Sequence, residues 1–107
     1  MTTFDNRKDA AEKKYAHDAE VMFKATARRN KLLGLWAAEK LGKSGADAET
    51  YAKSVVAADF EEAGDDDVVR KVKGDLDAAG AGVSEHQLRR TMDELLARAV
   101  DEVKAGR

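Results

Sequence analysis

The sequence has 107 residues, and its 19 basic and 21 acidic residues give a formal net charge of −2. This length predicts one domain with a modest core. The sequence contains no cysteine, which excludes disulfides, thiolate metal sites and cysteine nucleophiles. The mixed charge disfavours nucleic acid as a partner, because binding it requires several phosphates to be neutralised at once.

No apolar run approaches the roughly 20 residues needed to cross a bilayer, and the N-terminus lacks the apolar segment of a signal peptide. We therefore expect a cytoplasmic chain with no direct membrane insertion. The sequence has no proline and is rich in alanine, leucine, glutamate, lysine and arginine, which favour helices. The predicted fold class is all-α.

The first predicted element is a helix from about Asn6 to Leu41 that ends at Gly42. Its second half carries an apolar stripe at helical spacing, predicted to face a core: Met22, Ala25, Leu32, Leu33 and Trp36. Its first half is nearly all charge and alanine, and the stripe continues only thinly, through Phe4, Ala11 and Tyr15. We therefore expect a flexible or projecting arm at residues 1–19 and a four-helix bundle at residues 20–107, within a single domain spanning 1–107.

A second helix is predicted from near Asp47 to Ala63 and Gly64, after a loop at 43–46. Its apolar face is formed by Ala48, Ala52, Val55 and Val56, with Tyr51 and Phe60 flanking it. Asp59 falls near this face, a position explained if it lies at the end of the bundle. The short connections predict helices that pack as antiparallel neighbours on the second half of the first.

The third helix is predicted to be capped by Asp65 or Asp66 and to end at the glycine-rich segment 80–82. The fourth begins with the clearest local signal in the chain. Ser84 and Gln87 have the spacing of a capping box, and Val83 and Leu88 that of a hydrophobic staple. An apolar stripe then predicts helix to the C-terminus: Leu88, Met92, Leu95, Leu96, Ala99 and Val103.

Four patterns that suggest chemistry are better explained by structure. His17 and His86 lack the Glu-x-x-His spacing of bundle metal sites and are expected to be solvated. Residues 42–44 read Gly-Lys-Ser like the end of a phosphate-binding loop, but no strand or first glycine precedes them. The acidic segment 59–67 lacks EF-hand spacing, and the basic cluster 28–31 is interpreted as a solvated helix face. No catalytic or metal-binding residues are predicted, and an enzyme is the least favoured class.

Residues 23–42, FKATARRNKLLGLWAAEKLG, resemble a signature of the zeta subunit of alphaproteobacterial F-type ATP synthase. The resemblance extends to residues 4–7, to 15–18, and downstream through the second helix, 59–62 and the fourth helix. It implies a four-helix inhibitor of ATP hydrolysis. Its N-terminal arm would enter an interface of the alpha and beta subunits and reach the gamma stalk, thereby blocking rotation. It also implies weak binding of ATP or ADP, with no assigned residues and no required cofactor.

Under this resemblance the arm supplies the partner-binding residues. Phe4, Ala11 and Tyr15 would make the apolar contacts, and the charged residues would pair with the walls of the cleft: Asp5, Arg7, Lys8, Glu12, Lys13 and Lys14. His17 lies beside them and offers a pH-sensitive group. The chain would be held at the inner membrane only through the ATP synthase. The alternative is a non-inhibitory structural or nucleotide-sensing regulatory subunit of the same complex.

Overall fold

The computed structural model describes the backbone of residues 3–60 and 64–107 and the side chains of residues 17–60 and 64–107. In this part of the chain the secondary structure consists of four helices: α1 Thr3–Lys40, α2 Gly45–Ala58, α3 Asp66–Ala78 and α4 Glu85–Lys104. The all-α prediction is confirmed. Among the described residues, no helix combines the length and the apolar character that spanning a membrane requires.

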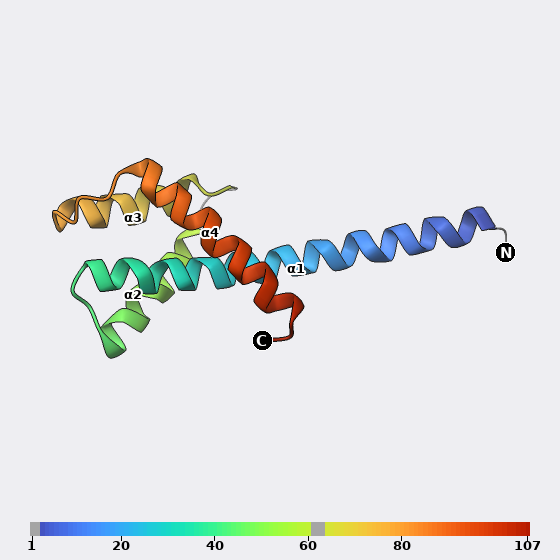
Figure 1. Cartoon of the computed structure of the whole chain (residues 1–107), viewed down its shortest axis with the longest axis horizontal. Coiled ribbons are helices and arrows are strands. Elements are labelled where there is room, and N and C mark those ends of the chain that lie inside the picture. Colours follow the sequence, from blue (N-terminus) through green and yellow to red (C-terminus); the bar gives the residue numbers. More distant parts are fainter. Residues whose placement is uncertain (1–2, 61–63) are drawn as a thin grey trace.

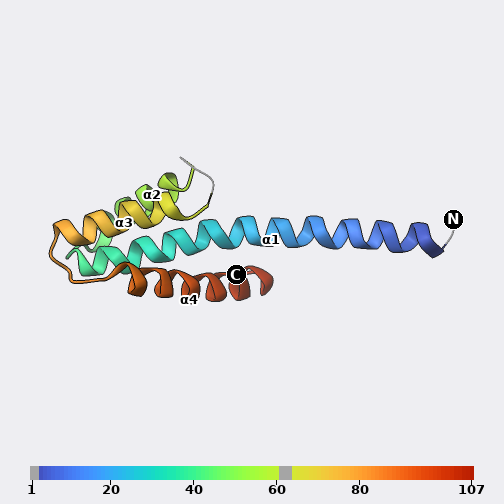
Figure 2. The same cartoon turned by 90° about the horizontal axis from the view of Figure 1, so that it is seen from above.

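The four helices form a bundle around the second half of α1. In Figure 2, α1 lies between α4 on one side and α2 and α3 on the other, and α1 contacts all three. Figure 1 shows the first half of α1 running past the ends of the other helices, which gives the molecule its length of 63 Å against 25 and 22 Å across. The prediction that the other helices pack on the second half of α1 is confirmed.

The core lies where α1 crosses its neighbours. Leu33 of α1, Val55 of α2, Leu76 of α3 and Leu88 of α4 are fully buried and belong to one apolar cluster. At the crossing of α1 and α2 a Cβ on Gly34 would lie 2.5 Å from the Cα of Ala52. The missing side chain therefore allows the two backbones to approach this closely.

The predicted inward stripe of α1 is only partly correct. Ala25 and Leu33 are fully buried, and Trp36 packs against the core while remaining half-buried. Met22, however, is 43% exposed. The stripe prediction is wrong there because the helices packed on α1 leave Met22 largely uncovered, and Val21 is the residue that turns inward.

The predicted end of the first helix is confirmed. Gly42 has a φ of 75°, its N–H donates to the carbonyl of Glu39 at 3.1 Å, and the N–H of Lys43 donates to that of Ala38 at 2.8 Å. This pair of hydrogen bonds is a Schellman motif, which needs a left-handed residue best supplied by glycine. Residues 42–44 thus form a helix terminus.

The predicted bounds of the second helix are wrong at both ends. α2 begins at Gly45 after Ser44 and ends at Ala58, whereas the prediction placed the start at Asp47 and the end at Ala63 and Gly64, of which residues 61–63 lie outside the described part. The last turn tightens, because the N–H groups of Asp59 and Phe60 donate three residues back. Asp59 therefore lies directly after the last residue of α2.

The starts of α3 and α4 contrast in their capping. Asp65 precedes α3 as predicted, but its side chain makes no capping hydrogen bond. At α4 the capping box is confirmed: the Ser84 hydroxyl accepts from the Gln87 N–H at 3.1 Å, and the Gln87 side chain accepts from the Ser84 N–H at 3.0 Å. Val83 and Leu88 are both buried, as the staple spacing predicted.

Candidate functional site

The predicted partner-binding residues lie on α1, in the part that extends beyond the bundle. Residues 4–15 belong to its helical backbone, and their side chains lie outside the described part. His17 is exposed. Along the chain, the first buried side chain of the described part is Val21, which is 6% exposed, one position after the predicted start of the bundle at residue 20.

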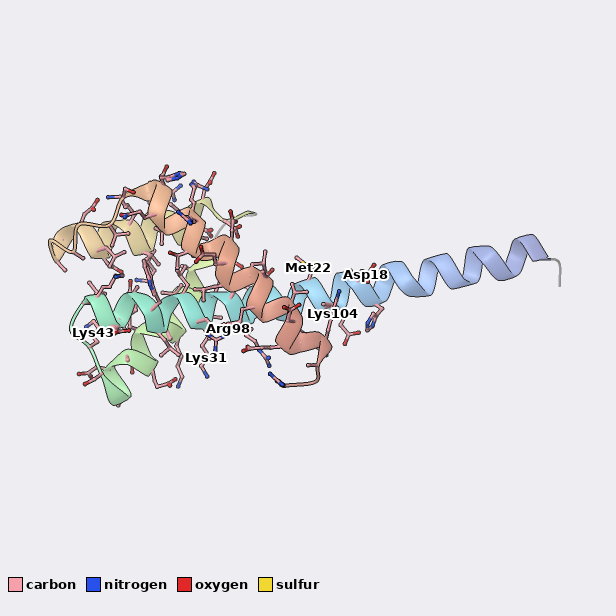
Figure 3. The ribbon with its side chains drawn as sticks, viewed as in Figure 1. Asp18, Met22, Lys31, Lys43, Arg98 and Lys104 are labelled. Carbon is pink, nitrogen blue, oxygen red and sulfur yellow. The ribbon has the colours of Figure 1, made fainter. Side chains whose placement is uncertain are left out.

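The C-terminal end of α4 lies beside α1 where α1 leaves the bundle. His17, Asp18 and Lys104 line one shallow hollow of about 430 Å³, and Figure 3 shows Asp18 on α1 near Lys104 of α4. Further along, Arg28 of α1 forms an ion pair with Glu102 at 3.6 Å and donates to the backbone carbonyl of Arg107. These contacts hold the end of α4 and Arg107 against α1 at Arg28.

A second hollow, on the face of α1 that turns toward the end of α2, is apolar. It has a volume of about 330 Å³, and its walls include Met22, Phe23, Val56 and Phe60. Phe23 and Phe60 are 71% and 78% exposed. In the part of the chain whose side chains are described, the large hydrophobic residues with highly exposed surface therefore all gather at this one place. We call it the apolar hollow.

The floor of the apolar hollow is polar. Asn30 lines it and is 1% exposed. Its Oδ1 accepts from the Nε and Nη2 of Arg29 at 3.0 and 2.9 Å, whereas its Nδ2 is buried without a hydrogen-bond partner. A buried amide donor without an acceptor is costly, so it marks a position where a further group would be stabilised.

Arg29 corrects the interpretation of the basic cluster 28–31. Arg29 and Asn30 are 2% and 1% exposed, whereas Arg28 is half-buried and Lys31 is exposed, so only part of the cluster is a solvated face. The guanidinium of Arg29 reaches the carboxylate of Asp65 through two hydrogen bonds, of 3.1 and 2.8 Å. The sequence pattern did not reveal this because the partner lies 36 residues away, in a loop whose position depends on packing.

The same ion pair explains the missing cap at α3. The hydrogen bond from Arg29 holds the pKa of the Asp65 carboxyl below its usual range, against the opposing effect of partial burial. The carboxylate therefore stays charged and turned toward α1. The ion pair links Asp65, in the loop before α3, to Arg29, whose neighbour Asn30 lines the apolar hollow.

The remaining candidates from the sequence are the two histidines and the acidic segment 59–67. Within residues 17–60 and 64–107 there is no group of three histidine or acidic side chains placed to hold a metal ion. The acidic segment 59–67 divides its described side chains between different roles. Asp59 lies at the edge of the apolar hollow, Asp65 binds Arg29, and Asp66 pairs with Arg89 at 3.1 Å. His86 is exposed at the start of α4, as predicted.

Sequence reasoning missed the apolar hollow. The signal that was present is the pair Met22 and Phe23, since two adjacent large apolar residues on a helix point about 100° apart and cannot both enter one narrow core face. Phe60, predicted to flank the apolar face of the second helix, also lines the hollow. Only the fold brings these residues together.

One of the comparisons with known proteins identifies a family. The family model described as ATPase inhibitor subunit zeta matches residues 1–102. Among solved structures, one determined by solution NMR is 53% identical and superposes with a TM-score of 0.70, covering 79% of this chain and 96% of its own. A search of curated proteins gives no match.

Proposed function

The chain belongs to the ATPase inhibitor subunit zeta family, and from this premise we propose that it inhibits ATP hydrolysis by inserting residues 1–19 of α1 into the catalytic head of the F-type ATP synthase. Family membership indicates a non-catalytic inhibitor subunit that associates with the ATP synthase. The proposal adds the mechanism: the arm enters an interface of the alpha and beta subunits near the gamma stalk and blocks rotation.

The observation that carries this proposal is the length of α1. The helix is continuous from Thr3 to Lys40, yet its buried side chains, within the described part, begin only at Val21. A charged helix of this kind buries little surface by itself and gains from a cleft that supplies apolar contacts. Because α1 is braced by α2 and α4, such an arm would transmit force to the bundle rather than swing aside.

The arm residues have distinct roles in this proposal. Phe4, Ala11 and Tyr15 continue one side of the helix by sequence position, and they would fill apolar pockets of the cleft. The charged residues between them would set the orientation of the helix by pairing with the cleft walls. His17, exposed at the base, would lie near the entrance.

The test compares the full chain with a version that begins at Glu20. Both are titrated into ATP hydrolysis by the isolated catalytic head, and complex formation is measured in the same samples. We expect the full chain to inhibit and the shortened chain to bind without inhibiting. Equal inhibition by the two versions would contradict the assignment to residues 1–19.

A finer version replaces single arm residues in the full chain. Phe4→Ser and Tyr15→Ser should each weaken inhibition by about tenfold or more if they are buried anchors, since truncating such a residue at an interface costs about 2 kcal/mol. The exposed Lys43, at the other end of α1, offers Lys43→Ser as a control that should inhibit like the natural chain.

The alternative is a non-inhibitory structural or nucleotide-sensing subunit of the same complex. Under it, the full and shortened chains would both bind the head and neither would inhibit. Weak binding of ATP or ADP remains a prediction, to which we assign no residues. Amide spectra recorded with and without ADP would test it, and an unchanged spectrum would contradict it.

A further inference from the structure

We propose that the apolar hollow is a second docking point for the catalytic head, which takes one apolar side chain of the head together with a backbone carbonyl of the same segment. This inference rests on the proposed function, since it assigns the same partner to a surface next to the arm. It differs from the arm in position and chemistry, because it uses described residues of the bundle itself.

The first support is the gathering of exposed apolar surface. Met22, Phe23 and Phe60 are 43%, 71% and 78% exposed, and all three line a hollow of about 330 Å³. Folding alone does not explain this arrangement, because these side chains contribute little to the core. Exposed aromatic residues around a hollow are typical of protein interfaces, where they become the residues that dominate affinity.

The second support is the amide of Asn30. Its Oδ1 is engaged by Arg29, which fixes the orientation of the amide and leaves Nδ2 as a buried donor without an acceptor. The atom is buried in the free protein, so an occupant makes this hydrogen bond only if the lining of the hollow shifts when it binds. A main-chain carbonyl that follows an apolar side chain into the hollow supplies such an acceptor.

The third support is position. Ala19 and Met22 belong both to the wall of the hollow and to the stretch where α1 leaves the other helices, as the Met22 label in Figure 3 shows. Ala19 is the last residue of the proposed arm and also lines the hollow. A catalytic head that binds the whole arm therefore reaches the hollow, so the hollow continues the proposed arm interface. The carboxylate of Asp59 at the edge favours an occupant segment with a basic residue beside its apolar one.

Two variants test the apolar and the polar part separately. Phe23→Ser removes an exposed ring from the wall, and Lys24→Ser is its matched control. The adjacent Lys24 side chain is also long and exposed, but it lines the hollow at the C-terminal end of α4 and pairs there with Glu20. Asn30→Asp keeps the oxygen that Arg29 binds and removes the unpartnered donor. Circular dichroism and thermal unfolding verify that each variant is folded.

The measurement is the dissociation constant of each full-length variant with the isolated catalytic head, recorded beside inhibition of ATP hydrolysis. We expect Phe23→Ser and Asn30→Asp to weaken binding by about tenfold or more, and Lys24→Ser to bind within about twofold of the natural chain. If the natural chain binds and inhibits while all three variants bind equally, the docking inference is wrong and the proposed function stands. If the natural chain does not bind the head at all, both are wrong.

Sedimentation of the free protein tests whether a second copy of this chain, rather than the catalytic head, occupies the hollow. A natural chain that self-associates, with Phe23→Ser monomeric and head binding unchanged, would assign the hollow to a second copy of this chain and overturn the inference. We expect instead that the natural chain and Phe23→Ser are both monomeric at the concentrations used for head binding.

Discussion

Within residues 17–40 of α1, whose side chains are described, one end buries its apolar side chains and the other end exposes most of them. Between residues 33 and 38 the helix is enclosed, with Leu33 and Ala37 fully buried and Gly34 against Ala52. Between residues 17 and 24 Val21 is buried, while Met22 and Phe23 face outward. One group of apolar residues on α1 therefore stabilises the bundle, and the other stays exposed to solvent. Our proposal assigns the exposed group to a partner.

The largest expected contrast comes from truncating one residue of each group. Leu33→Ala should lower the free energy of unfolding by about 2–5 kcal/mol, because it opens a cavity in the core. Phe23→Ala should change it by less than about 0.5 kcal/mol, since the ring is largely in water. Denaturant unfolding of the two variants measures both values. A large loss for Phe23→Ala would mean that the ring belongs to the core after all.

The next largest effect concerns Arg29, which lies on α1 between these two groups and pairs with Asp65. Arg29→Ala leaves Asn30 Oδ1 and the Asp65 carboxylate without their shared donor. Breaking a fully buried ion pair costs about 3–5 kcal/mol, but the Asp65 side chain is 47% exposed, so we expect a loss of about 2 kcal/mol in unfolding free energy. Arg90→Ala, at an exposed ion pair of α4, serves as a control and should cost less than about 1 kcal/mol.

A smaller loss is expected at the crossing of α1 and α2. Gly34→Ala places a methyl group 2.5 Å from a backbone atom of α2, and such overpacking costs about 1–3 kcal/mol. Alanine regains about 1 kcal/mol in helix propensity, so the net loss should be about 0–2 kcal/mol. Gly74→Ala on α3, where a Cβ meets nothing within 4 Å, should stabilise the protein. Stabilisation by both substitutions would mean that the two helices can separate at no cost.

The smallest effect is a dependence on pH. Arg29 lowers the pKa of Asp65 in the folded protein, so the carboxylate contributes stability that is fully present above its unfolded pKa, near pH 4. This contribution is lost as the pH falls through the lower folded pKa. The stability advantage of the natural chain over Asp65→Asn should therefore narrow as the pH drops below about 4. Urea unfolding of both proteins between pH 6 and 2.5 measures the difference, and a constant gap would contradict the linkage.

The predictable part of the candidate site is the part that a local pattern encodes. The sparse apolar stripe of residues 4–15 led us to predict a partner-binding arm, which stays a prediction. The resemblance of residues 23–42 identified the family, which the match to residues 1–102 confirms. The apolar hollow was not predictable in this way. Its walls come from two helices, and Phe60 meets α1 only because α2 folds back along it.

The sequence by itself determined the fold class and the helix ends written in short-range chemistry. Gly42 ends α1 because a left-handed residue is needed there, and Ser84 with Gln87 begins α4 because each satisfies the backbone N–H of the other. The tertiary structure alone decided which side chains of α1 are buried. Helical periodicity gives the direction of each side chain, but it does not say how far a neighbouring element extends over that side chain. Met22 is therefore exposed, and Arg29 is buried where it pairs with Asp65.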